Sequence, residues 1–154
     1  MDKPETPGVI APPPLIYLAG VVIGVILRNP VPTPILPRGL GYGLGAVLIL
    51  TAVSISLWGV QVMRRAGTAV NPRIPTTTLV TTGPFRFSRN PLYVSLTLCY
   101  LGIAIAAQSL WTLALLPVVL AVMQYGVIYR EERYLEGRFG AEYIRYRKRV
   151  RRWL

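Results

Sequence analysis

The chain has 154 residues, enough for one domain, and 53% are hydrophobic while only 15% are charged, which excludes an ordinary soluble domain. The absence of histidine and the single cysteine exclude a disulfide framework and the common zinc or iron sites, so we expect no metal. The net charge of +11 suggests nucleic acid as a partner. However, the basic residues lie at the ends of apolar runs, as they do in the cytoplasmic flanks of membrane helices. We therefore expect no nucleic-acid partner.

Apolar runs along the chain predict an all-α polytopic membrane protein with about four transmembrane helices. The proline-rich start lacks a basic n-region, so we expect no cleaved signal peptide. Residues 28–38 contain four prolines and predict a loop. Gly41 and Gly45 predict close packing of the second helix against a neighbour. The predicted transmembrane helices are residues 15–27, 39–63, 92–107 and 110–129.

A first polar segment, residues 64–91, carries five arginines and no acidic residue. Its β-branched run at 76–82 predicts an extended stretch, which is unstable alone and must lie on another segment, the C-terminal one being the candidate. Asn90 is a good N-cap and Pro91 suits the first position of a helix. The free N–H groups of that helix start predict a place where an anionic group can dock.

The second polar segment, residues 130–154, carries nine of the 17 basic residues. Apolar residues recur there at spacings of three and four, which predicts an amphipathic helix, and Gly137 and Gly140 predict that it breaks near Phe139. With both basic segments on one side of the membrane, the positive-inside rule places them and both chain ends in the cytoplasm. We therefore expect a multi-pass protein of a prokaryotic inner membrane.

Three motifs stand in order around the third and fourth apolar runs. In this order and spacing they resemble the integral-membrane methyltransferases that include isoprenylcysteine carboxyl methyltransferases and phospholipid N-methyltransferases. Asn90 replaces the histidine of that family and Ser95 replaces its glycine, so the identity of the methyl acceptor stays open. The motifs read Arg89-Asn90-Pro91-Leu92-Tyr93-Val94-Ser95, Glu131-Glu132-Arg133-Tyr134-Leu135 and Phe139-Gly140-Ala141-Glu142-Tyr143-Ile144-Arg145-Tyr146.

The resemblance implies a single methyltransferase domain, residues 1–154, whose two polar segments form the site. It implies methyl transfer from S-adenosylmethionine, entering from the cytosol, to a lipophilic or membrane-embedded carboxylate, amine or thiol. Membrane lipids are the expected partners, and the oligomeric state stays open. The resemblance implies catalytic roles for Arg89 and Glu132. It implies cofactor contacts from Val80, Gly83, Pro84, Asn90, Pro91, Tyr93, Glu131, Glu132, Tyr143 and Tyr146.

Alternative interpretations exist for several of these residues. The two glutamates can pair with surface arginines, Arg89 can anchor to lipid headgroups, and the tyrosines can form an interfacial aromatic belt. The rival hypothesis is therefore a non-catalytic membrane protein that binds anionic lipid through its basic tail. A lipid reductase with a nicotinamide cofactor lacks support, because the sequence has no dinucleotide-binding fingerprint.

Overall fold

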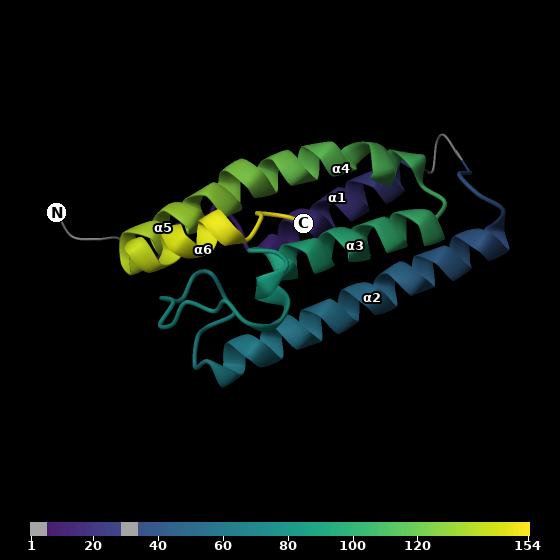
Figure 1. Cartoon of the computed structure of the whole chain (residues 1–154). Coiled ribbons are helices and arrows are strands. Elements are labelled where there is room, and N and C mark those ends of the chain that lie inside the picture. Colours follow the sequence, from purple (N-terminus) through teal and green to yellow (C-terminus); the bar gives the residue numbers. More distant parts are fainter. Residues whose placement is uncertain (1–5, 29–33) are drawn as a thin grey trace.

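The computed structural model describes residues 6–28 and 34–154, which form helices and loops without a strand (Figure 1). The all-α prediction is confirmed for this part of the chain. Part of the expected loop at 28–38 and the extreme N-terminus lie outside the described residues. The elements are α1 (Pro13–Arg28), α2 (Arg38–Arg65), the 3-10 turn η1 (Gly83–Arg86), α3 (Pro91–Ala106), α4 (Leu110–Met123), the π-helical turn η2 (Gln124–Ile128), α5 (Tyr129–Phe139) and α6 (Ala141–Arg149).

The four apolar helices lie side by side, with α3 between α2 and the pair α1 and α4 (Figure 1). Helix α2 and the continuous helix Leu110–Phe139 are long and apolar enough to cross a membrane. Helices α1 and α3 are apolar too, but each has 16 residues. At 1.5 Å per residue they are about 24 Å long, shorter than the hydrocarbon core of a bilayer.

Helix α2 approaches α3 closely through its glycines. A Cβ atom on Gly45 would lie 2.7 Å from the Gly102 carbonyl oxygen. The opposite side of α2 exposes large apolar side chains, including Leu50 and Leu57, each 67% exposed. A helix that is apolar on its exposed side as well as its packed side is typical of contact with lipid.

Replacing Gly45 by valine should therefore destabilise the protein by about 1–3 kcal/mol, because the new side chain forces α2 and α3 apart. Gly43 is the matched control, because it lies on the same helix and a Cβ atom there would meet no neighbouring segment within 4 Å. Thermal unfolding in detergent should show a clearly lower melting temperature for Gly45→Val and little change in melting temperature for Gly43→Val. Equal losses in the two variants would show that only helix propensity had changed.

The fourth apolar helix runs on into the polar tail. The sequence predicts its end at residue 129, but backbone bonding continues through the π-helical turn η2 and α5 as far as Phe139. A π-helical turn inserts one residue relative to the α-helical repeat and so rotates the residues that follow. The break expected near Phe139 is present at Gly140, whose φ of +51° suits glycine.

The loop of residues 66–82 lies over α5 rather than forming a strand. The backbone N–H of Thr76 donates to the Tyr134 hydroxyl at 3.1 Å. Within the loop, the backbone N–H of Thr77 donates to the Thr68 hydroxyl and its own hydroxyl donates to the Gly67 carbonyl. The expectation that this stretch rests on the C-terminal segment is confirmed by the contact with Tyr134.

Candidate functional site

A buried carboxylate held by two arginines forms the centre of the polar end of the molecule. Arg152 binds Glu132 with two hydrogen bonds, from Nε at 2.8 Å and from a terminal nitrogen at 2.7 Å. Arg89 approaches the same carboxylate at 3.1 Å, and only 8% of the Arg89 side chain is exposed. The hydrogen bond to Glu132 raises the pKa of Arg152. Paired, charge-assisted bonds of this kind fix both the position and the charge of the carboxylate.

The neighbouring carboxylate has different surroundings. Glu131 accepts a hydrogen bond of 2.7 Å from the Tyr93 hydroxyl and forms no ion pair with the described part of the chain. Consecutive residues on a helix point in directions about 100° apart, so the two glutamates do not share partners. One carboxylate is thus neutralised by arginines, while the other lies beside a phenol, and burial raises the pKa of Glu131 above its ordinary value.

Two buried tyrosines of α6 complete this region. Arg89 donates to the Tyr143 hydroxyl at 3.3 Å, and the Tyr146 hydroxyl donates to the Phe85 carbonyl at 2.7 Å. Burial, with a smaller effect of the Glu132 charge, raises the pKa of Tyr143 to about 12. Burial also raises the pKa of Tyr146. Both phenols therefore stay neutral at physiological pH, and the Tyr146 hydroxyl acts as a donor while the Tyr143 hydroxyl accepts from Arg89.

The C-terminal residues 150–154 tie the site together. The backbone N–H of Arg89 donates to the Arg151 carbonyl at 2.9 Å, and the side-chain amide of Asn90 donates to the Arg152 carbonyl at 3.0 Å. The Trp153 indole donates to Gln124 in η2 at 3.3 Å. The tail thus joins the start of α3, the π-helical turn and the carboxylate of α5.

The expectation that Asn90 is the N-cap of α3 is confirmed for its position but not for the side-chain hydrogen bond. Asn90 occupies the N-cap position, but its side chain makes no capping hydrogen bond. The reason is the tail, because the Asn90 amide donates to the Arg152 carbonyl instead of accepting from the helix. Capping propensity is a local preference, and a partner from a distant segment overrides it here.

A cavity of about 80 Å³ lies between the loop 66–82, α5 and α6. Arg89 contributes a buried Nε atom that has no hydrogen-bond partner in the described part of the chain. The other predicted site residues that line the cavity are Val80, Asn90, Glu131, Glu132, Tyr143 and Tyr146.

Four predicted site residues lie outside the lining of this cavity. Tyr93 reaches the site only through its hydrogen bond to Glu131. Gly83 adopts a φ of +60° and packs toward Trp58, so it shapes the entry to η1. Pro84 is buried as the second residue of η1 and Pro91 as the first residue of α3. These three set the course of the chain and do not face the cavity.

Sequence reasoning missed Arg152, one of the two arginine partners of Glu132. Arg152 belongs to a run of basic residues at the chain end, where charge alone suggests a solvated surface. The signal that was available is the ending Arg149-Val150-Arg151-Arg152-Trp153, which resembles the close of the methyltransferase family. Phe85, whose carbonyl binds Tyr146, carries no sequence signal because the contact is made by its backbone.

Fold and site together define a helical protein with apolar outer surfaces and a buried carboxylate–arginine site at one end of its helices. The model of the phospholipid methyltransferase family matches residues 40–142, from α2 into α6, and the chain belongs to this family. This places it in the group of isoprenylcysteine and phospholipid methyltransferases, as the motifs suggested.

Two relatives match parts of the chain. Over 70 residues it is 43% identical to the cobalt-zinc-cadmium resistance protein CzcN of Cupriavidus metallidurans, a stretch that makes up 44% of this chain and 32% of CzcN. The chain thus spans about a third of the length of CzcN. It is 42% identical over 64 residues to an uncharacterized protein of Haemophilus influenzae, covering 41% of this chain and all of that protein. No solved structure matches the chain at a significant level.

Proposed function

We propose that this protein transfers a methyl group from S-adenosylmethionine to a lipophilic acceptor in the membrane. Membership of the phospholipid methyltransferase family supports methyl transfer to a membrane substrate. The observation that carries the proposal is the convergence of Arg89, Glu131 and Glu132 on one cavity. Methyl transfer is a displacement that needs accurate positioning more than a metal or a histidine, so these residues suit it.

The donor and acceptor groups of the cavity fit the charged groups of this cofactor. Glu131 forms no ion pair with an arginine among the described residues, and we assign it to the ammonium or sulfonium group. The buried Nε–H group of Arg89, which has no hydrogen-bond partner among the described residues, suits the cofactor carboxylate. Val80 and the tyrosines of α6 would line the nucleoside part. The cofactor supplies a methyl group on a positively charged sulfur, the electrophile of the reaction.

Binding requires the cavity to widen. Its volume of about 80 Å³ is well below the roughly 300–1,000 Å³ of pockets that hold drug-sized ligands. The loop 66–82 forms one wall and contacts α5 through the hydrogen bond between Thr76 and Tyr134. We propose that this loop moves outward when the cofactor enters and closes over it afterwards, excluding water.

We further propose that α1 to α4 all cross a prokaryotic inner membrane, with the polar site on the cytosolic side. The cofactor would then enter from the cytosol and the acceptor from the bilayer. A carboxylate acceptor needs no base, whereas an amine must first lose a proton, which a nearby carboxylate such as Glu131 can accept. The acceptor classes are thus a carboxylate, an amine or a thiol.

Calorimetric titration of the detergent-purified protein with S-adenosylhomocysteine tests the proposal. We expect a Kd in the micromolar range for the wild type. Arg89→Gln should weaken binding about tenfold or more, because a hydrogen bond to a charged group contributes about 1.5–3 kcal/mol. Arg86→Gln removes the same charge from an exposed residue of η1 and should bind like the wild type.

Absence of binding by stable wild-type protein, in both detergent and lipid, would overturn the enzyme hypothesis. That result would favour the non-catalytic lipid-binding protein. Thermal melting of each variant shows whether a loss of binding reflects the site or a loss of folded protein.

A further inference from the structure

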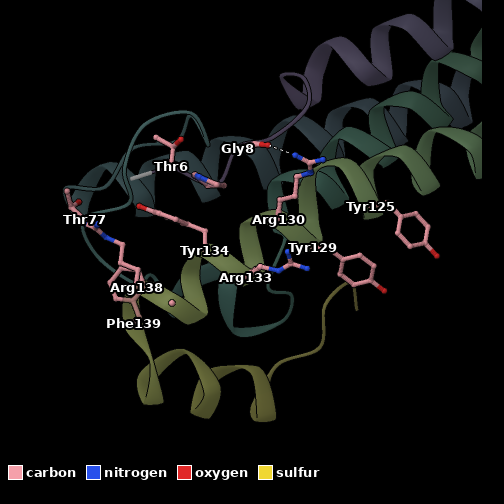
Figure 2. Close-up of a pocket in the computed structure, with 12 residues that line it drawn as sticks. Thr6, Gly8, Thr77, Tyr125, Tyr129, Arg130, Arg133, Tyr134, Arg138 and Phe139 are labelled. Atoms are coloured by element: carbon pink, nitrogen blue, oxygen red, sulfur yellow. Dashed lines mark hydrogen bonds between the residues drawn. The ribbon is translucent and has the colours of Figure 1, made fainter. Parts of the chain in front are cut away.

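A second, larger cavity, an open groove, lies on the other side of the contact between the loop 66–82 and α5. Its volume is about 1260 Å³, and it runs along η2 and α5 with the N-terminal residues 6–8 and Thr77 across from them (Figure 2). Tyr134 lines this groove, and its hydroxyl binds Thr76, which lines the smaller cavity. The contact between Tyr134 and Thr76 therefore separates the groove from the carboxylate–arginine site.

The groove is positively charged. Arg130, Arg133 and Arg138 line it, and no acidic side chain is found among its lining residues, all of which are described. Arg130 is held in place by a 2.9 Å hydrogen bond from its guanidinium to the Gly8 carbonyl, which leaves further N–H donors for a ligand (Figure 2). Arg133 and Arg138 are exposed and form no ion pair with the described residues. Guanidinium groups without acidic partners suit a phosphate.

The position of the groove indicates where the phosphate comes from. It begins beside Tyr125 and Tyr129, which are 70% and 39% exposed, at the point where the apolar helix gives way to charged residues. Exposed tyrosines next to arginines at such a boundary are typical of the headgroup region of a membrane. A soluble phosphate compound would not need this apolar edge.

We propose that the groove along Tyr125–Phe139 binds the phosphate headgroup of an anionic phospholipid. With the loop 66–82 closed, the contact between Tyr134 and Thr76 separates the groove from the carboxylate–arginine site, so this lipid is not the methyl acceptor. Its role is to fix α5 at the membrane surface. The inference does not rest on the proposed methyl transfer, since a non-catalytic protein would have the same groove.

The test compares two double variants that each remove two positive charges. R133Q/R138Q changes the groove, whereas R145Q/R149Q changes exposed residues of α6 that do not line it. Binding of phosphatidylglycerol and of phosphatidylcholine to the full chain is measured in mixed micelles and by native mass spectrometry. R133K/R138K, which keeps the charge, is the rescue variant.

We expect the wild type and R145Q/R149Q to prefer phosphatidylglycerol, and R133Q/R138Q to bind it about thirtyfold more weakly. R133K/R138K should recover most of the preference. Equal weakening in both glutamine variants would indicate diffuse charge and overturn the proposal, as would no weakening in either. Inorganic phosphate that competes as strongly as the lipid would overturn the choice of a lipid. Melting temperatures confirm that the variants are folded.

Discussion

Glu132→Gln is expected to destabilise the protein by about 3 kcal/mol, because removing one partner of a buried ion pair leaves the other charge unpaired. Arg89 has only 8% of its side chain exposed, and after the substitution no carboxylate of the described residues forms an ion pair with it. Arg152 also loses its bidentate partner, which loosens the C-terminal tail from the start of α3. Equilibrium unfolding in mixed detergent micelles measures the change in the free energy of unfolding.

The matched control is Glu136→Gln. Glu136 pairs with Arg147 at 2.7 Å, but the two side chains are 38% and 41% exposed. An exposed pair contributes at most about 1 kcal/mol, and salt weakens it further. If both substitutions had the same small effect, Glu132 would not be the structural centre of the site.

Glu131→Gln should weaken cofactor binding by about ten- to a hundredfold with a much smaller effect on stability, because a charged hydrogen bond contributes roughly 1.5–3 kcal/mol. The amide oxygen of glutamine can still accept from the Tyr93 hydroxyl, so the internal hydrogen bond survives. What the variant lacks is the negative charge. Calorimetric titration with S-adenosylmethionine and with S-adenosylhomocysteine measures the loss.

The two ligands distinguish the group that Glu131 contacts. Both carry an ammonium, but only S-adenosylmethionine carries the sulfonium. A larger loss for S-adenosylmethionine places Glu131 near the sulfur, and an equal loss places it at the ammonium. Glu142→Gln, which removes the same charge from an exposed residue of α6, should leave both affinities unchanged. Wild-type affinity in Glu131→Gln would show that the assignment of this residue is wrong.

These two predictions separate carboxylates that the sequence presents as equivalent. Glu131 and Glu132 are adjacent and belong to one motif, and nothing in the motif states which one is paired. In the structure, Glu132 pairs with two arginines, whereas Glu131 accepts a hydrogen bond from a tyrosine. The difference arises because adjacent helical residues point in different directions, so each meets a different neighbouring segment.

The sequence alone indicated where the apolar helices begin, because those signals are local, but it missed the continuation of the fourth helix to Phe139. Long apolar runs, Pro91 at a helix start and Gly140 after a helix end each act within one or two turns of the chain. The resemblance likewise indicated the methyltransferase family and seven of the 17 residues that line the small cavity. These features depend on residue type and spacing alone.

The tertiary structure decided which distant groups meet. Arg152 binds Glu132, which lies 20 residues away in the sequence, and the Asn90 side chain binds the Arg152 carbonyl, which lies 62 residues away. The basic groove likewise needs the N-terminal residues 6–8 and Thr77 to lie beside α5. Such contacts depend on how whole helices pack and where the chain returns, and a backbone carbonyl that accepts a hydrogen bond leaves no trace in the sequence.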